Sequence, residues 1–277
     1  MAGVKNITDK EFQRLATFIK NNYGIYLKPE KKTLLVGRLQ NLLAAGNYRT
    51  FTEYIDDLVS DTTGEAVINL LNRITTNHTF FMREAEHFYF FRDEVLPYLK
   101  ASIPDRDLRV WCAACSTGEE AYTLAMIIDE FFGAEAVFWD TRILATDISR
   151  QALEIAKKGI YSKERIAPLP AAWKLSYFDR YDADNVIVKD RIKNNVIYRT
   201  FNLVERVFPF RRKFHAIFCR NVMIYFDNDT KNELVNKFYH LLEDGGYLFI
   251  GHSESLNREK TSFKYVRPAV YRKIIRT

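Results

Sequence analysis

Polar residues directly follow two short apolar segments in this sequence, and their chemistry suggests a ligand site. The first segment runs into VWCAACSTGEEAY (110–122), where small side chains let a ligand approach the backbone. Glu119 and Glu120 in this stretch would repel a phosphate. The second segment ends in Asp147, whose carboxylate can accept both hydroxyls of a ribose. Capping of the following helices by these acids remains an alternative, but together the two segments predict a nucleoside site without a GxGxxG motif.

A third apolar segment, FHAIFC (214–219), is followed by Arg220 and Asn221, and Tyr225 lies four residues after Asn221. Polar residues of a surface turn are the alternative interpretation. The abrupt change from apolar residues to Arg-Asn favours a functional site.

The elements that must position these residues follow from the alternation of apolar segments with helical patterns after the first third of the chain. Such alternation predicts an α/β fold with a parallel sheet covered by helices on both faces. Ligands bind beyond the carboxyl ends of such strands, so we expect the three groups of polar residues to meet there. We expect strands near 108–112, 143–147, 196–201, 214–219, 247–251 and 270–275, and helices from about 118, after 149 and over about 227–243.

The first third of the chain is predicted to be helical. Thr8 with Glu11 and Thr50 with Glu53 are capping-box patterns, each followed by apolar residues at helical spacing. The second predicted helix, after Pro29, is basic and carries Lys28, Lys31, Lys32 and Arg38 beside Glu30. A solvated surface explains that charge, and a docking face for an acidic helix is the alternative.

Composition sets broad limits on function. The 277 residues include 41 Lys and Arg against 35 Asp and Glu, a net charge of +6 that suits either an acidic protein or nucleic acid. Three Cys, no signal-peptide pattern and no long apolar run predict a soluble, cytoplasmic protein without a disulfide framework.

The combination of motifs resembles the CheR family of chemoreceptor methyltransferases. The resemblance extends over both predicted domains and keeps the family order. The matching stretches are TTNHTFFMRE (75–84), VWCAACSTGEEAY (110–122), LATDIS (144–149), FNLVE (201–205), FHAIFCRNVMIYFD (214–227) and GHSES (251–255).

The resemblance implies a Rossmann-like class I methyltransferase sheet at 76–277 with a small β-subdomain inserted at 161–196. It also implies an all-α domain at 1–75 that docks on the receptor. The implied cofactor is S-adenosylmethionine, and the implied reaction forms methyl esters on glutamate side chains of methyl-accepting chemotaxis receptors. The expected partner is the cytoplasmic helical region of these receptors, with neither nucleic acid nor membrane insertion, and the expected state is a monomer.

The resemblance also implies roles for individual residues. Arg83 and Tyr225 would orient the substrate carboxylate and the methyl donor. Arg38 on the basic helix would contribute to docking. The implied cofactor-binding residues are Asn77, Thr79, Arg83, Glu119 (with Glu120 as a close rival), Asp147, Asn202, Leu203, Arg220 and Asn221.

Other interpretations have less support. Cys112-x-x-Cys115 lacks the second ligand pair of a zinc site, and Cys112 falls in a predicted strand. His252-x-Glu254 lacks the P-C-x-x-C of zinc deaminases, and the histidines show no metal-ligand spacing, so no metal is predicted. A nucleic-acid methyltransferase and a non-catalytic binding module remain the alternative functions. The stretch 178–190 has no Gly, which favours a member that needs no receptor tether.

Overall fold

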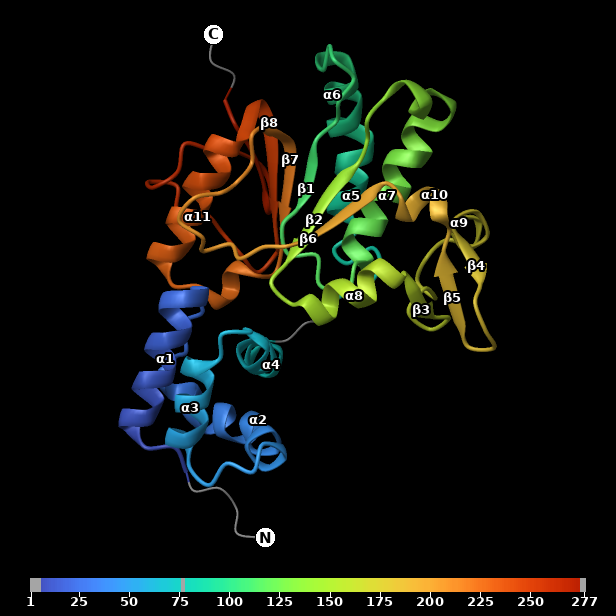
Figure 1. Cartoon of the computed structure of the whole chain (residues 1–277). Coiled ribbons are helices and arrows are strands. Elements are labelled where there is room, and N and C mark those ends of the chain that lie inside the picture. The colour runs from blue at the N-terminus through green and yellow to red at the C-terminus, as the bar shows by residue number, and fades with distance from the viewer. Residues whose placement is uncertain (1–5, 76–77, 275–277) are drawn as a thin grey trace. The chain divides into compact units, whose positions relative to one another are not determined.

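The computed structural model describes residues 6–75 and 78–274, and the chain divides into two compact units (Figure 1). The smaller unit comprises residues up to 77 together with 225–230. The larger unit comprises 78–224 and the chain from 231 onward. Each unit buries its own set of apolar side chains.

The smaller unit is helical, as its capping patterns predict. Thr8 and Glu11 form the reciprocal capping box. Thr50 accepts the Glu53 N–H at 3.1 Å, but the Glu53 carboxylate accepts from Arg49 instead of Thr50, so only half of the second box forms. The helices are α1 (Asp9–Tyr23), η1 (Pro29–Lys31), α2 (Lys32–Ala45), α3 (Phe51–Ser60) and α4 (Glu65–Ile74).

A seven-stranded sheet organises the larger unit, in the order β6-β2-β1-β7-β8-β10-β9. Neighbours from β6 to β8 pair in parallel, whereas β10 runs antiparallel to both β8 and β9. The predicted α/β class is therefore confirmed. The strands are β1 (Val110–Cys112), β2 (Ile143–Asp147), β6 (Val196–Thr200), β7 (Phe214–Cys219), β8 (Leu242–Ile250), β9 (Lys264–Arg267) and β10 (Val270–Arg272).

Helices cover both faces of this sheet, with α11 on one side and α5, α6 and α7 on the other (Figure 1). Gly118 precedes α7 with φ of +97°, and a Cβ there would lie 2.8 Å from the Ala156 Cβ, so the position requires glycine. The helices are α5 (Glu86–Phe90), the π-helical η2 (Phe91–Val95), α6 (Leu96–Ser102), α7 (Glu119–Phe132), η3 (Gly133–Phe138), α8 (Arg150–Lys158), η4 (Met223–Tyr225) and α11 (Asn228–Leu241).

The predicted insertion contains the expected antiparallel element. Its three strands pair in the order β3-β5-β4, and both pairings are antiparallel. The elements are β3 (Ile160–Ser162), α9 (Ala171–Tyr177), β4 (Phe178–Arg180), β5 (Asn185–Val188) and α10 (Asp190–Lys193).

Some element boundaries differ from those that the sequence predicts. The helix expected over 227–243 ends at Leu241, and β8 already begins at Leu242 and runs through both glycines. A Cβ on Gly246 would lie 3.0 Å from the His215 carbonyl oxygen, so this glycine lets two strands approach instead of ending a helix. Within 6–75 and 78–274, no helix combines the length and the apolar character needed to cross a membrane.

Candidate active site

The carboxyl ends of the parallel strands bring Asp147 next to two neighbouring segments. Its Oδ2 accepts the Ser116 N–H at 2.8 Å, and its Oδ1 accepts the Ser149 N–H at 2.9 Å. Burial raises the pKa of Asp147, and these N–H bonds oppose the rise. Each carboxylate oxygen keeps a lone pair, so Asp147 can still accept ligand hydroxyls.

The end of β6 lies beside Asp147, because the Phe201 N–H donates to the Asp147 backbone carbonyl at 3.0 Å. Asn202 then accepts the Val204 N–H with its side-chain Oδ1 at 3.2 Å, and Leu203 is buried. The structure therefore places Asn202 and Leu203 in the loop that follows the strand next to Asp147.

Arg220 is fully buried between two carboxylates. Its Nη1 lies 2.6 Å from Glu120 Oε2, and its Nη2 lies 3.1 Å from Glu84 Oε2. The guanidinium also donates to the Arg83 carbonyl and lies over the Phe88 ring, 5.0 Å from its centroid. Burial works to raise the pKa of Glu84, but Asn221 and Arg220 lower it overall, so Glu84 stays ionised. Breaking such a buried pair on one side leaves an uncompensated charge.

Glu254 holds the turn that follows β7. Its Oε2 accepts the N–H groups of Gly251 at 2.6 Å and of Asn221 at 3.0 Å, and its Oε1 accepts that of Ile224 at 3.1 Å. Asn221 has φ of +59°, and its amide donates to Glu84 at 3.0 Å. A Cβ on Gly251 would lie 2.4 Å from the Asn221 Nδ2, so this glycine makes room for the turn.

The two acids at the start of α7 have different partners. Glu119 is fully buried, its Oε1 lies 2.7 Å from Arg165 Nη2, and burial raises its pKa. Glu120 instead pairs with Arg220 and accepts from the Cys112 thiol at 3.2 Å. Glu120, the alternative to Glu119 as the cofactor-binding acid, thus belongs to the cluster around Arg220. The assignment of Glu119 to the cofactor stays a prediction.

Arg83 precedes Glu84 in a turn of strained backbone, because Glu84 has φ of +55° and Met82 has φ of +60°. The half-buried Arg83 guanidinium donates to the His78 carbonyl. Across 6–75 and 78–274, Arg83 forms no ion pair with an acidic side chain. Thr79 lies half-buried before this turn, and Asn77 lies outside the described residues.

Two predicted residues belong to the smaller unit. The Tyr225 carbonyl accepts the Tyr26 N–H at 2.8 Å, which holds Tyr225 against the segment that follows α1. Arg38 donates to the Ile74 carbonyl at 2.9 Å and so satisfies the end of α4. The catalytic role of Tyr225 and the docking role of Arg38 stay predictions.

Sequence reasoning missed Glu84 and Glu254 as site residues. Glu84 is the last residue of the stretch 75–84, and Glu254 belongs to GHSES, so both lay within recognised motifs. The alternation of apolar and polar residues could not reveal them, because their partners come from distant parts of the chain.

The cysteines do not form a redox centre in this structure. Cys112, Cys115 and Cys219 are free and buried, and burial raises the pKa of each thiol well above its usual value. A thiol with a raised pKa is a poor nucleophile at neutral pH.

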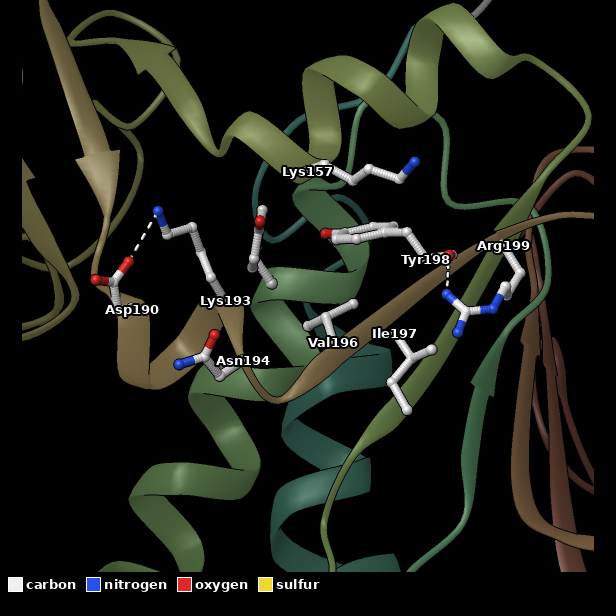
Figure 2. A pocket seen from close by; sticks show the side chains of 9 residues that line it. Lys157, Asp190, Lys193, Asn194, Val196, Ile197, Tyr198 and Arg199 are labelled. Carbon is white, nitrogen blue, oxygen red and sulfur yellow. Dashed lines mark hydrogen bonds and ion pairs between the residues drawn. The ribbon is translucent and has the colours of Figure 1, made fainter.

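A separate hollow of about 530 Å³ lies beside the edge strand β6 (Figure 2). Figure 2 shows Lys157 and Lys193 on opposite sides of it, and they pair with Glu154 and Asp190 at 2.7 and 2.9 Å. The hollow shares no lining residue with the cluster around Arg220. We therefore place the candidate active site at the carboxyl edge and not in this hollow.

Comparison with known proteins gives the family. Residues 77–271 match the model described as "CheR methyltransferase, SAM binding domain", and residues 10–75 match "CheR methyltransferase, all-alpha domain". The chain is 43% identical over 271 residues to a chemotaxis protein methyltransferase of Borreliella burgdorferi, covering 97% of this chain and 95% of the relative. It is 34% identical over 268 residues to a chemotaxis protein methyltransferase of Escherichia coli, covering 96% and 91%. This chain therefore belongs to the CheR methyltransferase family, and its cofactor is S-adenosylmethionine.

Proposed function

We propose that this enzyme transfers the methyl group of S-adenosylmethionine to glutamate side chains of chemoreceptors, giving glutamate methyl esters. The relatives named as chemotaxis protein methyltransferases support the pathway. The acceptor and the product rest on the chemistry of the site.

The cofactor half of the proposal rests on the carboxyl edge of the sheet. Asp147 would accept the ribose hydroxyls, since both of its oxygens keep free lone pairs. Asn202 and Leu203 would contact the adenine from the adjacent loop. Arg220 and Asn221 would lie on the methionine side, where Glu120 is better placed than Glu119 to receive an ammonium group. Thr79, and Asn77 by the resemblance, would lie over the bound cofactor.

One contrast carries the acceptor half of the proposal. Arg220 already pairs with two carboxylates, whereas no ion pair of Arg83 with an acid is found within the described chain. The two arginines are linked, because Arg220 donates to the Arg83 carbonyl. Arg220 would thus anchor the turn that presents the Arg83 guanidinium to an incoming carboxylate.

The methyl transfer itself requires few further groups from the protein. The cofactor supplies a methyl group that is already activated on a sulfonium. A glutamate carboxylate has a pKa of about 4.3, so it is ionised at neutral pH and needs no general base. Arg83 and Tyr225 would align the acceptor, and closure of the site would exclude water. His87 could not serve as a base at neutral pH, because burial lowers its pKa to about 3.

The lack of a base in His87 also weighs against nucleic acid as the methyl acceptor. An amine or hydroxyl of nucleic acid must lose a proton, whereas the Arg220 cluster holds paired carboxylates and guanidinium groups. The positive net charge of +6 fits an acidic receptor helix as well as it fits nucleic acid. Arg38 is the proposed docking residue, and we add Lys28 and Lys31 beside it to the proposed docking face, because Lys32 already pairs with Asp9 at 2.7 Å.

The test is transfer of labelled methyl groups to a receptor signalling fragment, read as base-labile esters. Arg83→Ala should lower turnover by at least about 100-fold, as misplaced reactants typically do, while the protein stays folded. Arg83→Lys is the matched control, with an intermediate rate. Near-normal turnover of Arg83→Ala would remove Arg83 from the mechanism, and base-stable label on nucleic acid would replace the proposed acceptor.

A further inference from the structure

Glu84, His87 and His252 bring one carboxylate and two imidazoles together within the larger unit. His87 lies in α5, three residues after Glu84, while His252 comes from the turn after β8. One potential ligand atom of each residue lies within 4.8 Å of the other two. The Glu84 Oε2 and the His87 Nδ1 are 3.6 Å apart, and the two imidazole rings meet edge to face with centroids 4.5 Å apart.

His87 has no hydrogen-bond partner that explains its burial. It is 1% exposed, and neither ring nitrogen makes a bond of good geometry within the described chain. Its Nδ1 lies 3.6 Å from the Glu84 Oε2, which is beyond the length of a hydrogen bond. A buried polar group without a partner needs an explanation, and an ion bound between the nitrogen and the carboxylate supplies one.

We propose that Glu84, His87 and His252 bind a divalent transition-metal ion of the zinc class. Two imidazoles and one carboxylate form a donor set that proteins use for zinc and for iron(II). Donors on one tetrahedral zinc ion, at bond lengths near 2.1 Å, stand about 3.4 Å apart, close to the spacing of Glu84 and His87. His252 is exposed, so it can move the remaining distance and gives the ion a path from solvent.

Binding would compete with the Arg220 cluster. The Glu84 Oε2 that faces His87 also accepts from Arg220 at 3.1 Å and from the His252 backbone N–H at 3.2 Å. Two carboxylates share the single Arg220 guanidinium, so negative charge remains for the ion. A metal that takes this oxygen weakens the hold on Arg220 and on the Arg83 carbonyl. We therefore expect reversible binding that inhibits methyl transfer.

Calorimetric titration of the metal-free full-length chain with zinc chloride tests the site without any substrate. We expect one ion per chain. His252→Gln should lower the affinity at least about tenfold, because even outer-shell changes at metal sites cost about 10- to 100-fold. His240→Gln removes another exposed histidine and should bind like the parent. Failure of the parent to bind zinc, or unchanged affinity in His252→Gln, overturns the site.

Inhibition is measured as each variant's methyl-transfer rate with zinc divided by its own rate without it, a readout that rests on the proposed function. The parent and His240→Gln should slow and recover with a chelator, and His252→Gln should resist. Zinc that binds through His252 but leaves transfer unchanged overturns the link to Arg220. A receptor that is not methylated at all affects the proposed function alone, because the binding titration stands without it.

Discussion

Two arginines occupy opposite edges of the same sheet, and each is held by acids beside a histidine. At the carboxyl edge, Arg220 is 0% exposed and pairs with Glu84 and Glu120. At the amino edge, Arg109 is 15% exposed and pairs with Asp107 and Glu243, both at 3.0 Å.

The backbone and the histidines differ between these edges. Among the described non-glycine residues, Glu84, Ser116 and Asn221 have positive φ at the carboxyl edge, whereas only Arg106, in the turn before β1, has positive φ at the amino edge. His215 accepts the Arg109 N–H at 3.1 Å, while His87 lacks such a bond. Strain and unsatisfied groups persist where function needs them. The comparison therefore suggests that the amino edge serves stability and the carboxyl edge serves chemistry.

Conservative substitution of the two arginines gives the largest expected contrast. Arg220→Lys keeps the charge but loses the fork that spans both carboxylates, so we expect methyl transfer to fall at least about 100-fold. Arg109→Lys should keep transfer within about twofold and lower the urea midpoint of unfolding, because it removes packing and hydrogen bonds only. Equal losses of activity in both variants would break the comparison.

Glu254 tests whether the turn after β7 must be held by a charge. In Glu254→Gln, one oxygen is replaced by an amide that cannot accept, so we expect about a tenfold loss of kcat/KM, comparable to about 1.4 kcal/mol. Glu243→Gln at the amino edge is the matched control and should leave kcat/KM unchanged. A Glu254→Gln variant with full activity and raised stability would show that the carboxylate serves no positioning role.

The sequence predicts the elements with clear signals and misses those without. The strand 143–147 and the strand 214–219 have the predicted bounds, because each is a short apolar run with a polar residue at its end. Residues 86–102 form α5, η2 and α6, yet their aromatic run with Pro97 lacks a clean helical period. Strand β9 is exposed on an edge and too polar to stand out.

The site follows the same division. Asp147, Arg220 and Asn221 are visible because each follows an apolar strand, and topology dictates where such residues meet. Glu120 and Glu119 are adjacent in sequence, and only the direction of each side chain from α7 separates their partners. The meeting of His252 with His87 depends on long-range packing, which residue spacing does not encode.

The pH dependence of unfolding tests whether the amino edge serves stability. Burial, followed by Arg109, lowers the pKa of His215 to about 4, against about 6.5 unfolded. The unfolded chain therefore takes up this proton first, so the stabilising term is complete above pH 6.5 and is lost as the pH falls towards 4, by up to about 1.4 kcal/mol per pH unit. His215→Asn, whose Oδ1 can accept the Arg109 N–H, should flatten the slope between pH 7 and 5 in urea unfolding, with transfer at pH 7 unchanged. His87 contributes a slope of the same sign, so a residual slope is expected.

The smallest effect on activity and stability is expected for Arg212, an exposed residue at the amino edge. Arg212 pairs with Asp105 at 2.7 Å, but the two side chains are 58% and 50% exposed. Exposed pairs gain little, because water screens the attraction and holding two long side chains costs entropy. Arg212→Gln should therefore leave both transfer and the urea midpoint within error, in contrast to Arg109→Lys. A clear loss of stability would extend the supporting network to the surface, because Arg212 also contacts Asp107, the acid that holds Arg109. In that case the buried part of the network would depend on its exposed rim, and the contrast with the self-contained Arg220 cluster would be sharper.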